Sequence, residues 1–250
     1  MARLDALALA VDPENGARAE TAALNARYGD LDARRLIALA LDELFPDRIA
    51  LVSSFGADSA VLLHLVAEID RSLPVIFLDT GRLFAETLEY RTRLSALLGL
   101  TDVRTVAPDP ARLAGNDPHR ALWMTNPDLC CHIRKTEPLR RALAGFDAWF
   151  TGRKRFQNAR RSDLPVFEAD GHRIKVNPLA SWTADDLRAY IDRHDLPEHP
   201  LVSRGYPSIG CVPCTTRVAP GEDERSGRWR GLDKTECGIH GDLEIDGSGI

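Results

Sequence analysis

The sequence predicts a single α/β domain with a mainly parallel central sheet and flanking helices. Short apolar segments that are expected to be buried strands alternate with helical segments of ten residues or more. This alternation is typical of βαβ units, because parallel strands need a long crossover connection that is usually a helix. Ligands of open parallel sheets bind beyond the carboxyl ends of the strands. The residues that follow each strand are therefore the first candidates for a site.

The elements of this fold can be assigned in chain order. Residues 1–45 are expected to be a helical segment packed on the core, because LDARRLIALALDELF has apolar residues at helical spacing. The expected strands are residues 48–54, 73–81, 101–108 and 146–154. Helices are expected at residues 60–69 and at 84–99, the second closed by Gly99.

The second half of the chain is less regular. Residues 164–179 are expected to form a hairpin that turns at Asp170-Gly171, and Thr183 is expected to cap a further helix. Residues 46–215 would then be the α/β domain. Residues 216–250 would be a C-terminal arm, mobile without ligand because glycine makes it costly to order.

Composition excludes some classes of function. The net charge of −5 gives no general indication of nucleic-acid binding. No apolar run approaches the roughly 18 residues of a membrane span, and Asp5 interrupts an N-terminal run too short for a signal peptide. We therefore expect a cytoplasmic protein. Basic residues nevertheless gather at 134–141, 153–161 and 217–234, which favours a small, highly charged anion over three unrelated solvated surfaces.

Four of the five cysteines suggest a metal centre. Cys130 and Cys131 are adjacent, and a disulfide between neighbours would be strained. Cys211 and Cys214 form a Cys-x-x-Cys turn, and the two pairs together supply the four sulfurs of a zinc site or a [4Fe–4S] cluster. A redox dithiol at Cys211 and Cys214 is the alternative, but the motif lies late in the chain, in a loop. The adjacent pair favours a cluster over zinc.

The fifth cysteine is a candidate nucleophile. Cys237 lies in a glycine-containing tail downstream of Arg225, Arg228 and Arg230. Cationic neighbours increase the thiolate fraction that performs nucleophilic chemistry. The alternative is an unreactive surface cysteine.

The segment SSFGADS lies between an expected strand and helix, where backbone N–H groups can bind an anion. It resembles the Ser-Gly-Gly-x-Asp-Ser loop of ATP pyrophosphatases, with matches at Ser54, Gly56, Asp58 and Ser59. It differs at Phe55, where that loop has its first glycine. This difference favours a nucleotide with an anion other than pyrophosphate.

Together the motifs resemble the sulfonucleotide reductases, and within them the iron–sulfur adenylylsulfate (APS) reductases. The matching segments are SSFGADSAVLLH, FLDTGRLFAET, CCHIRKTEPL, TGRKRFQNAR, GCVPCTTRVAPGEDERSGRW and ECGIH. The resemblance implies an adenine nucleotide alpha hydrolase-like fold, related to the ATP pyrophosphatases. It also implies thioredoxin-dependent reduction of APS to sulfite and AMP in sulfate assimilation and cysteine biosynthesis, and a homo-oligomer.

The resemblance also implies roles for individual residues. The ligands of a [4Fe–4S] cluster would be Cys130, Cys131, Cys211 and Cys214. Cys237 would be the nucleophile, and the phosphosulfate would be surrounded by Lys135, Arg225, Arg228 and His240. The nucleotide would be bound by Ser54, Gly56, Asp79, Thr80, Gly81, Arg82 and Leu83, together with Arg155 and Gln157.

Three other functions remain open at this stage. A reductase of the 3′-phosphorylated nucleotide (PAPS) is the nearest, although that branch typically lacks the four cluster cysteines. An iron–sulfur enzyme that thiolates tRNA would need ATP activation, which Phe55 argues against. A non-enzymatic Cys₄ zinc module would leave Cys237 and the nucleotide loop unexplained.

Overall fold

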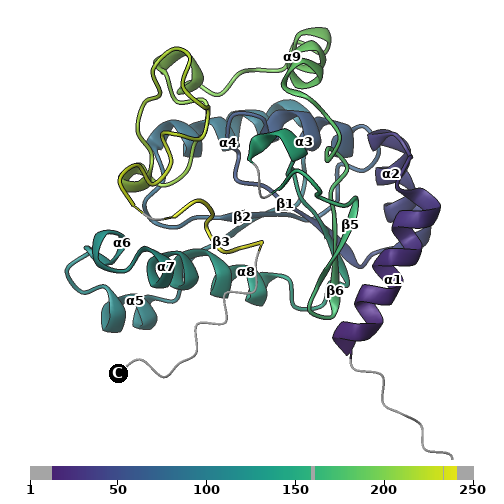
Figure 1. Ribbon diagram of the computed structural model, residues 1–250, viewed down its shortest axis with the longest axis horizontal. Coiled ribbons are helices and arrows are strands. Elements are labelled where there is room, and N and C mark those ends of the chain that lie inside the picture. The colour runs from purple at the N-terminus through teal and green to yellow at the C-terminus, as the bar shows by residue number, and fades with distance from the viewer. Residues whose placement is uncertain (1–12, 159–160, 233, 241–250) are drawn as a thin grey trace, which may run out of the picture.

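Six strands of the described residues form one sheet, in the order β3-β2-β1-β4-β6-β5 (Figure 1). The structure is a computed structural model that describes residues 13–158, 161–232 and 234–240. The strands are β1 (Ile49–Val52), β2 (Val75–Leu78), β3 (Val103–Val106), β4 (Ala148–Phe150), β5 (Phe167–Asp170) and β6 (Arg173–Val176). Every neighbouring pair is parallel except β5 and β6, which form an antiparallel hairpin. The prediction of a mainly parallel sheet is confirmed.

Helices cover both faces of this sheet. Helices α2, α3 and α4 lie on one face, with α9 packed outside α3, and α5 to α8 lie on the other (Figure 1). Their bounds are α1 (Pro13–Tyr28), α2 (Ala33–Leu39), α3 (Ser59–Ala67), α4 (Ala85–Leu98), α5 (Pro110–Asn116), α6 (Leu122–Thr125), α7 (Pro127–Cys131), α8 (Glu137–Ala142) and α9 (Ala184–Arg193). Shorter turns are η1 (Ala40–Leu44), η2 (His132–Thr136), η3 (Arg155–Gln157), η5 (Val202–Arg204) and η6 (Val212–Cys214). No helix in the described part of the chain is long and apolar enough to cross a membrane.

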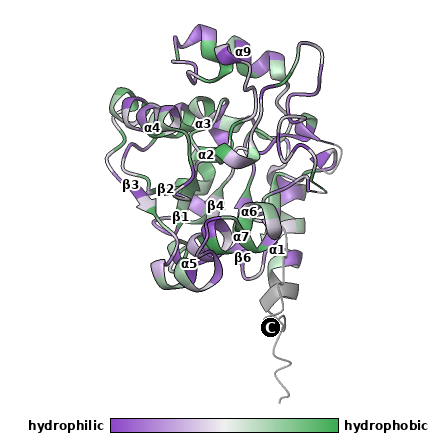
Figure 2. Ribbon diagram, turned by 90° about the vertical axis from the view of Figure 1, so that its left-hand side faces the viewer, coloured by the Kyte–Doolittle hydropathy of each residue, from purple (hydrophilic) through white to green (hydrophobic). Residues whose placement is uncertain are grey.

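Strand residues alternate between two apolar layers. On β1, Leu51 packs in the layer that contains α3, whereas its neighbour Ala50 packs in the layer that contains Leu139 of α8. Successive side chains of a strand point to opposite faces, so a strand buried on both faces is apolar throughout. Figure 2 shows hydrophobic residues concentrated in the central strands and α3. The core therefore fixes where each strand ends, and with it the positions of the residues that follow.

Local signals in the sequence explain several boundaries. Gly99 ends α4 in the left-handed conformation, with φ 66°. The Thr183 side chain accepts a hydrogen bond from the Asp186 N–H, and Asp186 accepts one in return, which forms a capping box at the start of α9. The hairpin turns at residues 171–172, one residue later than predicted, because Asp170 pairs with Arg173.

Helix α1 packs on β5 at one edge of the sheet. The Asn25 carboxamide donates to the Phe167 carbonyl oxygen at 2.7 Å and accepts from the Phe167 N–H at 2.9 Å. A side chain thus occupies the position that a neighbouring strand would take. Ala33, Leu36 and Ile37 of α2 are buried in the core as well. Residues 1–12 lie outside the described residues, as do residue 233 and residues 241–250 of the predicted arm.

The strand order has a reversal between β1 and β4. The chain proceeds from β1 to β2 and β3 on one side, and then returns to place β4 on the other side of β1. The connections that leave β1 and β4 therefore diverge, which opens a crevice at the carboxyl ends of these two strands. The fold itself places a ligand site at this position.

Candidate active site

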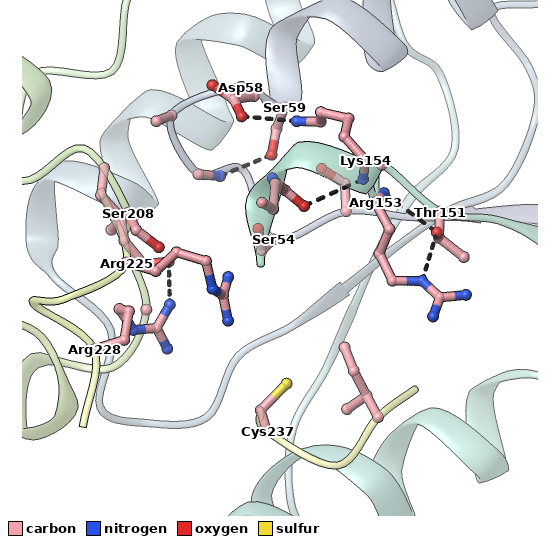
Figure 3. Close-up of a pocket in the computed structure, with 18 of the residues that line it drawn as sticks. Ser54, Asp58, Ser59, Thr151, Arg153, Lys154, Ser208, Arg225, Arg228 and Cys237 are labelled. Carbon is pink, nitrogen blue, oxygen red and sulfur yellow. Dashed lines mark hydrogen bonds and ion pairs between the residues drawn. The ribbon is translucent and has the colours of Figure 1, made fainter. Parts of the chain in front are cut away.

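A pocket of about 360 Å³ opens at this reversal point, a volume in the range of small-molecule sites. Its walls come from four parts of the chain: the loop after β1, the loop after β4, the loop before Cys211, and the C-terminal segment that includes Cys237. Figure 3 shows the Cys237 sulfur directed into the space between Ser54, Arg153 and Arg228. The nucleophile predicted from the sequence therefore faces the predicted nucleotide loop.

The loop after β1 has a conformation that ordinarily favours glycine. Phe55 has φ 48°, in the left-handed region. Its side chain is fully buried and lies edge-on against Phe77, with ring centroids 5.5 Å apart. Burial of the ring stabilises a backbone conformation that glycine would adopt without strain. The substitution that distinguishes this loop from the pyrophosphatase loop therefore leaves its backbone in the glycine-type conformation.

A buried ion pair joins the loops after β1 and β4. Lys154 is 2% exposed, and its Nζ lies 2.7 Å from Asp58 Oδ2 (Figure 3). Burial lowers the pKa of Lys154, and the Asp58 carboxylate partly offsets that shift. At the helix side of the loop, the Gly56 N–H donates to Ser59 Oγ at 2.9 Å. The ion pair joins the two loops across the reversal point, and the Gly56–Ser59 hydrogen bond shapes the loop after β1.

The other side chains of the loop after β4 do not all point into the pocket. Arg153 donates to Glu168 and to Thr151, and Arg161 pairs with Glu236 at 2.7 Å; both line the pocket. Gln157 lines the pocket too, and its side-chain oxygen accepts from the Lys154 N–H. Arg155 is exposed and donates to the Leu164 carbonyl oxygen instead. The structure does not place Arg155 in the pocket wall.

Two cations on the opposite wall flank Cys237. Arg228 donates to the carbonyl oxygen of Ile209 at 3.2 Å, and its guanidinium stacks on the Trp229 ring. A Cβ at Gly210 would lie 2.5 Å from Arg228 Cζ, so only glycine leaves room for this guanidinium. Burial lowers the pKa of Arg228, against the opposite effect of the Cys237 thiolate.

Lys135 lies on the turn η2 and lines the pocket as well. Burial alone would lower the pKa of Lys135. The thiolates of Cys211, Cys237 and Cys131 together raise it by more than burial lowers it, so the pKa of Lys135 is raised. Neither Lys135 nor Arg228 has a carboxylate within ion-pair distance among the described residues. These two cations are therefore available to an anion beside Cys237.

His240 takes a position deeper in the pocket wall. Its ring stacks on Trp149 of β4, with centroids 5.5 Å apart and an interplanar angle of 10°. Burial and nearby cations, above all Arg153, hold the pKa of His240 well below its usual range. His240 is therefore neutral, and its contacts support the segment that carries Cys237.

The turn after β2 contains five of the predicted substrate-binding residues. Thr80 and Leu83 line the pocket. The Asp79 carboxylate accepts from the Gly81 N–H at 2.9 Å, so these two residues shape the turn and do not line the pocket. Arg82 points the other way and pairs with Asp117 at 3.2 Å. The sequence motif is contiguous, but a turn directs alternate side chains to different sides.

A second, enclosed cavity lies behind this turn and is lined by Cys130, Cys131, Cys211 and Cys214; we call it the cysteine cavity. All four thiols are buried. Cys211 Sγ lies 3.2 Å from Thr80 Oγ1, and Leu83 bridges to the Cys211 backbone, which joins the cavity to the turn after β2. Lys135 lines both the cavity and the pocket.

The four thiols that line the cysteine cavity are a donor set that suits thiolate ligation of a metal centre. Among residues 13–158, 161–232 and 234–240, no three His, Cys, Asp or Glu side chains converge on a site for a single metal ion. The four sulfurs instead surround one space from two chain segments. Burial raises the pKa of Cys131 to about 12, and burial also raises those of Cys130 and Cys214. A cationic group in the cavity would offset this cost of ionising the thiols.

A shared carboxylate fixes the wall of the cavity. Asp117 accepts from Arg134 at 2.7 Å and from the Leu122 N–H at 2.9 Å, in addition to its contact with Arg82. Arg134 also donates to the Thr80 carbonyl oxygen. Burial raises the pKa of Asp117, but these hydrogen bonds and charges lower it overall.

Sequence reasoning missed several pocket residues. Lys154 and Arg161 were seen only as members of a basic cluster, and Asp58 only as a motif match. The partner of Lys154 is Asp58, which is 96 residues distant in the chain. The π-helical turn η2, which presents Lys135 between the two cavities, also had no signal in the sequence. The clustering of charge was the one sign that these residues share a site.

The fold and the pocket first define a class: an adenine nucleotide alpha hydrolase-like α/β protein. The same fold occurs in the crystal structure of Candida glabrata FMN adenylyltransferase in complex with FMN and an ATP analogue. The two are 17% identical with a TM-score of 0.52, and the match covers 81% of this chain and 74% of that one.

A domain match and a relative of high identity identify the family, and a solved structure is similar to this chain. Residues 48–217 match the phosphoadenosine phosphosulfate reductase domain. The chain is 58% identical over 229 residues to the adenosine 5′-phosphosulfate reductase of Mesorhizobium japonicum, which covers 92% of this chain and 90% of that protein. It is 27% identical to the phosphate complex of Candida auris phosphoadenylyl-sulfate (PAPS) reductase, with a TM-score of 0.68 and coverage of 80% and 97%.

The chain therefore belongs to the phosphoadenosine phosphosulfate reductase domain family. This confirms the sulfonucleotide reductase family predicted from the motifs. It also confirms the prediction of an oxidoreductase that acts on a sulfur group.

Proposed function

We propose that this protein reduces APS to sulfite and AMP in sulfate assimilation, with Cys237 as the nucleophile. The observation that carries this proposal is the position of the Cys237 thiol, which faces the nucleotide loop and is flanked by the cations Lys135 and Arg228. A thiol beside two cations without carboxylate partners suits attack on an anionic sulfur centre. The name of the relative from Mesorhizobium japonicum supports APS as the nucleotide.

The chemistry divides into two thiol steps. In the first, the Cys237 thiolate attacks the sulfur of the phosphosulfate, the bond to the phosphate oxygen breaks, and AMP leaves. The enzyme then carries an S-sulfocysteine. In the second, an external thiolate attacks the Cys237 sulfur, sulfite leaves with the bonding electron pair, and a mixed disulfide forms that a second thiol resolves. Two thiols are oxidised and one sulfur is reduced by two electrons.

The chain's residues have separate tasks in this scheme. Lys135 and Arg228 neutralise charge that develops on the leaving phosphate, a contribution that is usually large in such reactions. Ser54, Gly56, Thr80 and Leu83 would contact the nucleotide from the strand-end loops. His240 is neutral and stacked on Trp149, so we assign it to support of the Cys237 segment rather than to charge neutralisation.

A [4Fe–4S] cluster would be held by Cys130, Cys131, Cys211 and Cys214. This assignment is supported by the four buried thiols, which line one cavity from two segments of the chain. When bound, the cluster core would offset the charge of the four thiolates and would tie the two cysteine-bearing segments together beside Lys135.

Paired cysteine variants test the proposal. In Cys237→Ser we expect no detectable sulfite from APS, while iron content and the visible iron–sulfur absorbance stay at wild-type level. In Cys214→Ser we expect loss of iron and of thermal stability. Sulfite release, iron content and thermal unfolding are measured on the same preparations. Wild-type iron and activity in Cys214→Ser would contradict the ligand assignment, and residual turnover in Cys237→Ser would contradict the nucleophile.

A reductase of PAPS is the second candidate, supported by the name of the similar Candida auris structure. Relative kcat/KM on APS and PAPS decides between them. A preference for PAPS of tenfold or more, about 1.4 kcal/mol of differential transition-state binding, would reverse the choice of nucleotide but keep the mechanism. Thioredoxin as the external thiol, a cytoplasmic location and a homo-oligomer remain predictions from the sequence.

A further inference from the structure

Residues 234–240, which carry Cys237 and which we call the cysteine segment, are tied to the core near both ends. Lys234 pairs with Asp128 of α7. At the other end, Lys175 of β6 donates to the His240 carbonyl oxygen at 3.3 Å. These contacts set where the segment runs, but neither lies next to Cys237.

The contact next to Cys237 is a carboxylate clamp. Glu236 Oε1 accepts from Asn158 Nδ2 at 2.7 Å and pairs with Arg161 Nη2 at 2.7 Å. Glu236 Oε2 pairs with Arg225 Nη2 at 3.3 Å, and the same Arg225 nitrogen donates to the Thr235 carbonyl oxygen at 3.1 Å. Only 10% of the Arg161 side chain and 24% of the Glu236 side chain are exposed. Partial burial makes such a pair stronger than one on an open surface.

The cations of the pocket form two groups, those with a carboxylate partner and those without one. Arg153, Lys154, Arg161 and Arg225 each have a carboxylate partner, whereas Lys135 and Arg228 have none among the described residues. An incoming anion competes with an existing ion pair at the first group but not at the second. The charge available to substrate therefore lies at Lys135 and Arg228, and the charge of Arg161 is used within the protein.

We propose that Glu236 and Arg161 act as a pair of positioning residues that hold the Cys237 thiol over the pocket. This inference rests on the proposed role of Cys237 as nucleophile. Glu236 precedes Cys237 directly, so its carboxylate fixes the backbone from which the thiol projects. Arg161 anchors that carboxylate to the loop after β4, at the reversal point of the sheet. Misplacement of a reacting atom by about 1 Å can reduce the rate about a hundredfold.

A double-mutant cycle on the holoenzyme tests the pairing. Glu236→Gln and Arg161→Gln are each expected to lower kcat about ten- to hundredfold with KM changed less than about threefold. The double variant should resemble Glu236→Gln alone, because Glu236→Gln already removes the contact with Arg161, whereas Arg161→Gln leaves Arg225 and Asn158 on Glu236. Glu236→Asp keeps the charge but is one methylene shorter, so an intermediate kcat is expected, and it serves if Glu236→Gln does not fold.

Glu222 and Arg230 form a matched control pair. Their side chains lie 2.8 Å apart in the same part of the chain, but they are 39% and 45% exposed and do not line the pocket. Glu222→Gln and Arg230→Gln should each leave kcat within about twofold of wild type. If the effects of Glu236→Gln and Arg161→Gln multiply in the double variant, or fall on KM, Arg161 contacts substrate and the clamp is wrong.

A chemical readout separates failure of the clamp from failure of the proposed function. Alkylation of Cys237 by iodoacetamide, followed by peptide mass spectrometry, needs no nucleotide. The rate is compared at its high-pH plateau, so that a change in ionisation of the thiol does not contribute. Glu236→Gln and Arg161→Gln should raise this plateau rate at least about fivefold because the segment opens more often. Plateau rates within about twofold of wild type would overturn the clamp, whatever the substrate is.

Discussion

Lys135 lies between two cavities whose walls use arginine in different ways. In the wall of the cysteine cavity, Arg82 and Arg134 share the carboxylate of Asp117, and Arg134 also bonds to the backbone of the turn after β2. The pocket also contains arginines with carboxylate partners, but Arg228 differs from them, because within the described residues it bonds only to carbonyl oxygens. Arginine with a buried carboxylate partner is part of the scaffold, whereas arginine held by neutral groups keeps its charge for a ligand.

The difference shows that residue type and motif position do not determine role. Arg82 directly follows the Asp-Thr-Gly segment and yet belongs to the scaffold, because the turn directs it to the cavity side. Substitutions in the two walls should therefore act on different quantities. Changes at the cavity wall should lower stability, and changes at the open cations of the pocket should lower the rate.

The largest expected effect is the loss of Asp117. Its side chain is 1% exposed, so Asp117→Asn leaves two buried guanidiniums without a counter-charge. We expect the free energy of unfolding to fall by about 3–5 kcal/mol, measured by chemical denaturation of the iron-loaded protein. Asp102→Asn is the control, because Asp102 pairs with Arg104 on the surface and should matter by less than about 1 kcal/mol. Equal effects of the two substitutions would refute the distinction between the walls.

In the nucleotide loop, a somewhat smaller loss of stability than for Asp117→Asn is expected for Phe55→Gly, and Phe55→Ala is its comparison. Phe55→Ala removes the buried ring but keeps a side chain in the left-handed region, at a cost of about 3–5 kcal/mol. Phe55→Gly removes the ring and also relieves about 1 kcal/mol of backbone strain, so we expect a loss of about 2–4 kcal/mol. Thermal or chemical unfolding of both variants gives the difference. A Phe55→Gly protein less stable than Phe55→Ala would show that the strained conformation is absent.

The smallest free-energy change is expected at Lys135, where the two cavities meet. Lys135→Ala removes a charge-assisted contact worth about 1.5–3 kcal/mol, so kcat/KM should fall by about one to two orders of magnitude. Iron content should persist, because Lys135 is not a ligand. Arg140→Ala, at an exposed position of α8, should leave kcat/KM unchanged. Loss of iron together with activity would instead place Lys135 in the scaffold of the cavity.

Much of this arrangement could be predicted from the sequence because its signals are local. The strands are short apolar runs, Gly99 and Thr183 mark helix ends, and the cysteine spacing marks a shared centre. The direction of a side chain within a turn is not local. Arg155 and Arg82 lie in the correct segments but point out of the pocket, because backbone contacts elsewhere decide their orientation.

Pairings across the chain were also beyond the sequence. Nothing near Glu236 indicates that its partner is Arg161, since the two meet only when the C-terminal segment crosses the loop after β4. The same holds for Asp117. Its sequence neighbours do not indicate that it pairs with Arg82 and Arg134 in the folded protein. Long-range ion pairs depend on topology, and topology follows from the sum of many local choices.

The contact of Asn25 with β5 has a consequence for how copies of this chain can associate. An edge strand with free N–H and C=O groups is a template for pairing with another chain and for aggregation. At Phe167 both groups are already bonded to the Asn25 carboxamide. Helix α1 therefore prevents another strand from pairing with β5 at this residue. Loss of residues 13–28 would free both backbone groups of Phe167 and expose this edge of the sheet to pairing with another chain.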